Sequence, residues 1–218
     1  MSMIRHHMSD ELLLAYVQGS MPEGWSLVTA THLALCPHCR ARVADFEAIG
    51  GEALETVAPA PLAPEALARA LTQAKAGAVS TPRIPRAPGG ADAPVLPLPL
   101  RDYAGGDADT IAWAPIGAGI RQRVLTKGPA IARLLYIPAG KAVPIHSHNG
   151  PECTLVLTGA LLDRGETYAR GDVELTDESW LHQPVAGADE PCISLAVTDA
   201  PLIFKTMWPR LLQPWIGI

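Results

Sequence analysis

The chain has 218 residues, of which 48% are hydrophobic and 18% are charged, and it carries a formal net charge of −5. This composition excludes a wholly disordered chain, and the length allows one large domain or two small ones. Because the charge is negative and Lys and Arg form no run, direct binding to nucleic acid is disfavoured. The sequence has neither a signal-peptide core nor about 18 consecutive apolar residues, so we expect a cytoplasmic protein without a membrane segment.

The first 80 residues carry the signals of short helices. Ser9 is a helix cap followed by two acidic residues, and Ser20 with Glu23 has the spacing of a capping box. Four helices are predicted, from Ser9 to Gly19, from Ser20 to Leu33, from Pro37 to the Gly50-Gly51 break, and from Pro64 to about Ala76. A helical bundle of this size has a small core and often depends on a metal or another staple.

The helix signals end near residue 79, where the chain becomes rich in Pro, Ala and Gly, and this composition predicts a linker. Beyond it, β-prone runs alternate with Gly and Pro, a spacing typical of a small barrel or sandwich. The predicted strands are Ile111–Ala114, Ile120–Leu125, Ala130–Ile137, Cys153–Leu157, Asp172–Leu175 and Ile193–Val197.

These elements predict an α+β protein with two domains. The expected divisions are a helical domain at 1–80, a linker at 81–100, a β domain at 101–206 and a tail at 207–218. The tail contains two tryptophans, and we interpret it either as a flap packed on the β domain or as a contact surface.

The four cysteines divide into a C-x-x-C pair, Cys36 and Cys39, and the single residues Cys153 and Cys192. In a reducing cytoplasm this pattern favours metal or redox chemistry over a disulfide framework. We expect the two single cysteines to be core residues rather than sensors. Cys153 directly follows Glu152, so on a strand the two side chains should point in opposite directions.

The first candidate site consists of His32, Cys36 and Cys39. Residues four apart share one face of a helix, so His32 and Cys36 can address one metal ion, and Cys39 follows three residues later. Imidazole and thiolate suit Zn²⁺, which takes four ligands in a structural site. The fourth ligand is expected from His6 or His7 near the N-terminus.

Other interpretations of the C-x-x-C pair are a redox dithiol and coincidence. A thioredoxin-like motif should follow a strand, whereas this pair follows a predicted helix. His38 lies between the two cysteines, and its side chain should point in a different direction from theirs around the helix. The N-terminal histidines are therefore favoured as the source of the fourth ligand.

The segments Arg5–Asp10 and Ala30–Ala41 resemble the zinc-binding anti-sigma domain of ChrR-type regulators, which join this domain to a cupin. The resemblance implies that the first three helices and a more mobile fourth are wedged between the two main domains of an extracytoplasmic-function sigma factor. Sequestered in this way, the sigma factor cannot reach the core polymerase. The zinc ligands that the resemblance implies are His7, His32, Cys36 and Cys39.

The second candidate site starts from His146 and His148, which would face the same side of a strand. The turn Asn149-Gly150-Pro151 can return Glu152 beside them, and a later strand can supply His182. A His₃Glu set can hold Zn²⁺, Fe²⁺ or Mn²⁺ and usually leaves coordination positions open. The alternative, polar residues satisfied on a half-exposed sheet, is disfavoured by three histidines and a glutamate together.

The spacing of this site resembles the first cupin motif, G-x5-H-x-H-x3-E-x6-G, and implies a cupin β-barrel for the C-terminal domain. The residues that match the motif are Gly140, His146, His148, Glu152 and Gly159. The second cupin motif fits less well, because His182 lies eleven positions after Gly171, so His182 is the ligand with the weakest support.

These observations favour a regulator over an enzyme. The resemblance implies an anti-sigma factor that forms a one-to-one complex and releases its sigma factor in response to singlet oxygen or an organic hydroperoxide. Its helical domain would hold Zn²⁺, and the cupin one divalent metal, with Zn²⁺ preferred over Fe²⁺ or Mn²⁺. The alternative is a cupin enzyme, such as a small dioxygenase or isomerase, since an open His₃Glu site also suits catalysis.

Overall fold

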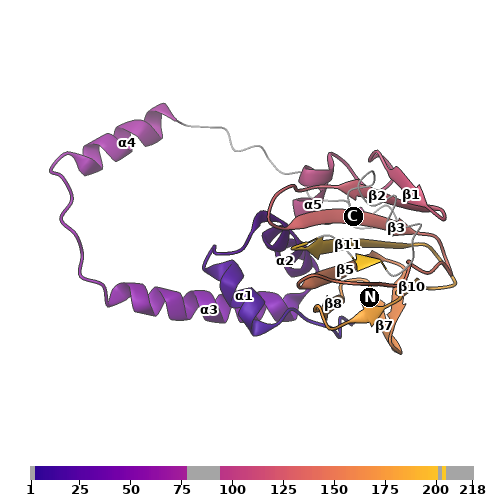
Figure 1. The fold of residues 1–218 in the computed structure, drawn as a ribbon. Coiled ribbons are helices and arrows are strands. Elements are labelled where there is room, and N and C mark those ends of the chain that lie inside the picture. The colour runs from indigo at the N-terminus through magenta and orange to yellow at the C-terminus, as the bar shows by residue number, and fades with distance from the viewer. Residues whose placement is uncertain (1–2, 78–93, 201–202, 205–218) are drawn as a thin grey trace. The chain divides into compact units, whose positions relative to one another are not determined.

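Figure 1 shows the fold in a computed structural model, which describes residues 3–77, 94–200 and 203–204. Contacts divide the chain into two compact units, residues 1–46 with 94–218, and residues 47–93. The domain boundaries expected from the sequence therefore stay a prediction. Within the described residues, no helix combines the length and the apolar composition that crossing a membrane requires.

The helices differ from the predicted ones mainly at their ends. The five described helices are α1 (Asp10–Val17), α2 (Glu23–Leu35), α3 (Pro37–Glu55), α4 (Ala66–Ala76) and α5 (Leu98–Ala104). Ser9 caps α1 as predicted, its Oγ accepting a hydrogen bond from the Leu12 N–H at 3.4 Å. The capping box at Ser20 is wrong, because Pro22 stands at the N-cap of α2 without a side-chain hydrogen bond.

The predicted helix break at Gly50-Gly51 is also wrong, since α3 continues to Glu55. Glycine costs a helix about 1 kcal/mol relative to alanine but does not prevent it from continuing. Helix α5 begins inside the range expected for the linker, at residues 98–100, and its Leu100 is fully buried. Of the expected linker, residues 81–93 lie outside the described residues, as do residues 207–218 of the expected tail.

The β region (residues 114–204) contains the described strands, paired antiparallel in three sheets. The six-stranded sheet has the order β1-β2-β3-β11-β5-β8, and the three-stranded sheets have the orders β10-β6-β7 and β12-β4-β9. Every predicted strand overlaps an observed one, although Ile111–Ala114 shares only Ala114 with β1. The strands are β1 (Ala114–Gly117), β2 (Ile120–Val124), β3 (Ile131–Ile137), β4 (His146–Ser147), β5 (Glu152–Thr158), β6 (Ala160–Asp163), β7 (Glu166–Ala169), β8 (Val173–Thr176), β9 (Leu181–His182), β10 (Val185–Ala186), β11 (Cys192–Thr198) and β12 (Ile203–Phe204).

The large sheet has one apolar and one polar face, and both are buried. Across four neighbouring strands the register aligns Leu134, Leu195, Leu155 and Val173. One residue earlier or later along each strand, the register aligns Arg133, Ala196, Thr154 and Glu174 on the opposite face. Because side chains alternate along a strand, the apolar row faces the helices and the polar row faces the interior of the β region.

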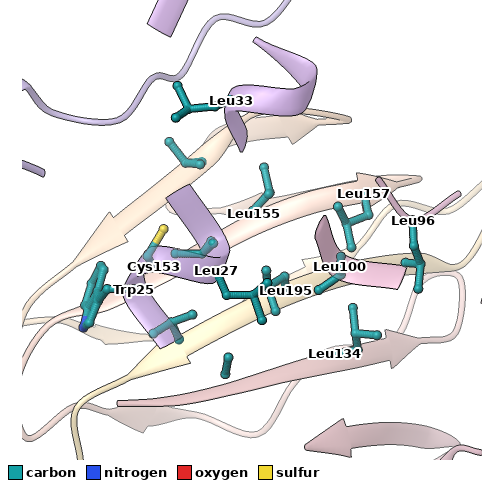
Figure 2. Packing of buried hydrophobic residues seen from close by; sticks show 14 of the residues in the cluster. Trp25, Leu27, Leu33, Leu96, Leu100, Leu134, Cys153, Leu155, Leu157 and Leu195 are labelled. Atoms are coloured by element: carbon teal, nitrogen blue, oxygen red, sulfur yellow. The ribbon is translucent and has the colours of Figure 1, made fainter. Parts of the chain in front are cut away.

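Helices α2 and α5 cover the apolar face of the large sheet (Figure 2). Leu27 of α2 and Leu100 of α5 are packed in one cluster with the sheet residues Leu134 and Leu195. The backbone of α2 comes so close to the sheet that a Cβ at Gly24 would lie 2.8 Å from the Ala130 carbonyl oxygen. Helices α2 and α5 therefore share one hydrophobic core with the β region.

The second compact unit contains the end of α3 and the whole of α4. None of its described residues, 47–77, is buried. Several large apolar side chains in it are exposed, namely Ile49, Leu54, Val57, Leu62, Leu67 and Leu71. The described residues of this unit therefore expose apolar side chains and bury none of them.

Candidate metal centres

The helical cluster unites the four residues expected to bind zinc. His7 precedes α1, His32 lies in the last turn of α2, Cys36 joins α2 to α3, and Cys39 lies in the first turn of α3. Their ligand atoms all lie within 4.8 Å of one another. Cys36 adopts an extended backbone before Pro37, which ends α2 and turns the chain so that both cysteines face the histidines.

The separations within this helical cluster suit a tetrahedral ion. His32 Nε2 lies 3.2 Å from Cys39 Sγ, and His7 Nδ1 lies 3.3 Å from Cys36 Sγ and 3.7 Å from Cys39 Sγ. Ligand atoms at 2.0–2.3 Å from one Zn²⁺ are about 3.3–3.8 Å apart at the corners of a tetrahedron. These three separations therefore agree with a tetrahedral zinc site.

The structure chooses between the N-terminal histidines. His7 reaches the two thiols, whereas His6 lies on the other side of the segment, with Nδ1 3.6 Å from Asp172 Oδ2. His38 is exposed and stacks on His7 with ring centroids 4.5 Å apart. The two rings therefore lie against different groups, His7 against the thiols and His6 against Asp172.

Burial shapes the protonation of the helical cluster. It lowers the pKa of His32 to about 4, so the ring is neutral near pH 7, and its Nδ1–H donates to the Gly171 carbonyl at 2.9 Å. This tautomer leaves the Nε2 lone pair directed at the cluster. Burial, together with the nearby Cys36, raises the pKa of the Cys39 thiol to about 12. A cation would supply the positive charge that a Cys39 thiolate needs here.

The β cluster unites the other four candidates, and all four are buried. His146 of β4 lies directly opposite His182 of β9 in the antiparallel pairing, and His148 and Glu152 lie on either side of the turn into β5. His182 Nε2 is 2.8 Å from His148 Nε2 and 3.2 Å from His146 Nε2. The strand pairing therefore brings in His182 despite its poor fit to the second cupin motif.

Neighbouring groups orient two of these histidines. The Nδ1 of His182 lies 2.8 Å from Asp163 Oδ2, and the Nδ1 of His146 lies 2.8 Å from the Pro144 carbonyl. Both rings thus direct Nε2 toward the β cluster, as in metal sites where a second hydrogen bond fixes the ligand. Burial lowers the pKa of His146, which keeps its lone pair available. Sequence reasoning missed Asp163, because nothing in its local pattern signals a distant histidine.

Glu152 and Glu174 respond differently to their surroundings. Burial opposes ionisation of Glu152, but the hydrogen bond and charge of His148 outweigh it and leave the pKa below the ordinary value. Burial and the neighbouring Asp163 raise the pKa of Glu174 to about 9, so this carboxyl is protonated near pH 7. Glu152 is therefore an anionic ligand candidate, and Glu174 a neutral partner of Asp163.

A cavity of about 440 Å³ lies beside the β cluster. Its walls come from α1, α2 and the strand ends, and they include the ligand candidate Glu152. Most of its lining is apolar, with Leu12, Met21, Trp25 and Leu175 among the residues involved. The cavity therefore lies where α1 and α2 meet the large sheet, and Glu152 borders it at the start of β5.

Comparison with known proteins extends over almost the whole chain. The family model of the ChrR cupin-like domain matches residues 102–200. Over 216 residues the chain is 46% identical to the anti-sigma-E factor ChrR of Cereibacter sphaeroides, covering 99% of each chain. The crystal structure of Rhodobacter sphaeroides SigE in complex with the anti-sigma ChrR contains a chain that is 45% identical, with a TM-score of 0.75, covering 89% of this chain and 99% of that one.

Proposed function

The chain belongs to the ChrR family of anti-sigma factors, and we propose that it binds and inhibits an extracytoplasmic-function sigma factor in a one-to-one complex. The observation that carries this proposal is the 46% identity to an anti-sigma factor across 99% of both chains. The same relationship confirms the expected fold class, a helical part followed by a cupin β-barrel, and favours a regulator over a cupin enzyme. The proposed place of action is the cytoplasm, where sigma factors meet RNA polymerase.

The proposed sigma-binding surface includes the end of α3 and helix α4. Leu67 and Leu71 lie one helical turn apart on α4, and 70% and 52% of their surfaces are exposed. Apolar side chains in these positions need a cover that residues 47–77 do not supply from within. A groove between two sigma-factor domains offers such a cover.

The proposed cofactor of the helical cluster is Zn²⁺. The fit rests on two thiols and two imidazoles whose separations match a tetrahedron. When bound, the ion supplies a fixed junction between α2, α3 and the N-terminal segment. The proposed ligands are His7, His32, Cys36 and Cys39.

The proposed cofactor of the β cluster is one divalent metal, with Zn²⁺ favoured over Fe²⁺ and Mn²⁺. The proposed ligands are His146, His148, Glu152 and His182. Three imidazoles and one carboxylate leave positions open for a small molecule. We propose that this centre reports singlet oxygen or an organic hydroperoxide, which the open coordination positions would allow to reach the metal.

Reconstitution tests the inhibitor function. The zinc-loaded full chain, mixed with an extracytoplasmic-function sigma factor from the same genome, should elute as a one-to-one complex and block transcription by the reconstituted polymerase. Cys39→Ala removes one proposed zinc ligand and should abolish both effects. His38→Ala, a change at an exposed residue outside the helical cluster, should leave both intact. A loaded chain that binds no sigma factor from that genome would overturn the proposal.

Oxidant treatment of the complex tests the sensing role. His148→Ala should bind the sigma factor normally but release it at least tenfold more slowly under singlet oxygen or hydroperoxide, since one β-cluster ligand is gone. Gln183→Ala, beside His182 but exposed, is the matched control. Release by His148→Ala at the normal rate would remove the β cluster from the sensing mechanism.

A further inference from the structure

The turn between β7 and β8, residues 170–172, contacts the helical cluster. Its Gly171 carbonyl accepts the hydrogen bond from Nδ1 of His32 at 2.9 Å, and both residues are buried. His32 belongs to α2 and Gly171 to the β region, 139 residues later. A backbone group of the β region therefore selects the tautomer of a candidate zinc ligand.

Asp172 holds the segment that precedes His7. Its Oδ1 accepts hydrogen bonds from the backbone N–H groups of Arg5 at 2.7 Å and of His6 at 3.0 Å. Its Oδ2 accepts from the Ala169 N–H at 2.8 Å, which anchors the carboxylate to its own turn. Three N–H donors on a carboxylate that is 1% exposed hold the pKa of Asp172 below its ordinary value despite burial.

The first residue of β8 adds a backbone contact to the same segment. The Val173 N–H donates to the His6 carbonyl at 3.2 Å. His6 is therefore bound through its N–H by Asp172 and through its carbonyl by Val173, which leaves little freedom for the adjacent His7. The position of this ligand candidate depends on the β region as much as on the helices.

Gly171 is a glycine for two reasons. Its φ of +93° lies in the region that disfavours other residues, and a Cβ there would lie 2.5 Å from Cδ1 of Ile4. Gly165, in the turn between β6 and β7, has a similar φ of +87°, but a Cβ there would meet no atom within 4 Å. Both glycines would be strained by a side chain, but only at Gly171 would that side chain also meet the N-terminal segment. Comparing alanine substitutions at the two positions therefore separates the two effects.

We propose that the Gly171–Asp172 turn of the β region forms part of the zinc site of the helical cluster. Gly171 positions His32, and Asp172 positions His7 through the backbone of residues 5–6. Neither residue touches the metal; both are positioning residues. The inference rests on the proposed zinc binding by the helical cluster.

Cobalt substitution in the full chain isolates this site. Only the helical cluster contains thiols, so thiolate-to-Co²⁺ charge-transfer absorption reports it, and Co²⁺ in the β cluster gives no such band. Zinc competition against the bound Co²⁺ then yields the relative affinity of the helical cluster. Asp172→Ala and Gly171→Ala should each lower this affinity by about tenfold to a hundredfold. Asp189→Ala, at an exposed carboxylate, and Gly165→Ala are the matched controls and should change it less than twofold.

Two further measurements separate positioning from loss of folding. In each variant, the β cluster should still bind one Co²⁺, measured as bound metal that gives no thiolate-to-Co²⁺ absorption. This result would show that the β cluster is intact. Asp172→Asn keeps one oxygen for the Arg5 and His6 N–H groups and should recover part of the affinity.

The outcomes distinguish the two proposals. A wild-type chain without thiolate-to-Co²⁺ absorption would refute zinc binding by the helical cluster, and the inference with it. A wild-type chain that shows this absorption, with unchanged affinity in Asp172→Ala and Gly171→Ala, would refute only the positioning role. An equal loss in Gly165→Ala would attribute the Gly171 effect to backbone strain and would also count against positioning.

Discussion

The four cysteines have two distinct chemical environments. Cys36 and Cys39 face histidines in the helical cluster, whereas Cys153 and Cys192 are buried among apolar side chains. Burial raises the pKa of Cys192 to about 12 and also raises that of Cys153. Cys153 and Glu152 point to opposite faces of β5, as expected, so this thiol lies away from the β cluster.

Alkylation followed by mass spectrometry tests this division. In the folded, metal-loaded chain, iodoacetamide at pH 8 should modify none of the four thiols. After a chelator removes the metal, Cys36 and Cys39 should react, because the ion that joins α2, α3 and the N-terminal segment is then lost, whereas Cys153 and Cys192 should react only in denaturant, because they lie on strands of the folded β region. Rapid modification of Cys192 in the folded chain would contradict its assignment as a core residue.

Helix α2 joins the helical cluster to the β region. Its inner face packs against the large sheet, and its last turn carries His32. Strand β8 also lies near both clusters. The turn that precedes it contacts His32 of the helical cluster. Its Glu174 lies beside Asp163, which contacts His182 of the β cluster. The surroundings of both clusters therefore share one strand.

The contact of α2 with the sheet predicts an unusual effect of Gly24→Ala. Alanine normally stabilises a helix relative to glycine, but here its Cβ would lie 2.8 Å from the Ala130 carbonyl oxygen. We expect destabilisation by about 1–3 kcal/mol, as for other overpacked sites, measured by urea unfolding. Gly51→Ala in α3, where a Cβ meets no atom within 4 Å, should not destabilise the chain. Equal stability of the two variants would contradict the close packing of α2.

The two compact units of the whole molecule differ in their cores. Residues 1–46 and 94–218 contain the buried apolar clusters, whereas the described residues of the unit 47–93 bury no side chain. This contrast indicates that folding stability and partner binding depend on different units. The first unit accounts for stability and holds both candidate metal centres, and the second offers apolar surface to a partner.

Charges placed on α4 test this separation. Leu67→Glu with Leu71→Glu should weaken sigma-factor binding at least tenfold in a titration, because both side chains are exposed and apolar. The melting temperature of the free chain should not change. Gln73→Glu with Ala76→Glu adds the same charge on the opposite side of α4 and should bind almost normally. A lower melting temperature for the leucine variant would show that α4 contributes to the folded core.

Much of the fold could be predicted from local patterns, as shown by the cap at Ser9 and the strand around Leu134. The predicted break at Gly50-Gly51 failed because helix propensity is a small energy, and the expected linker overlaps the start of α5, residues 98–100, where Leu100 is buried against the sheet despite the flanking prolines. Motif spacing singled out six of the ligand candidates, since ligands on one helix or strand must repeat at its period: His32, Cys36, Cys39, His146, His148 and Glu152. The choice of His7 came from the family resemblance, and His182 fitted its motif poorly.

The sequence by itself determined the types of donor atom, the order of helices and strands, and the family resemblance, because these depend on residues close together along the chain. Only the tertiary structure placed the His7 ring, and not that of His6, beside the two thiols, paired His146 with His182, and placed Gly171 against His32. The last contact spans 139 residues. Such contacts depend on strand register and on burial against a distant element, and no local pattern encodes either of them.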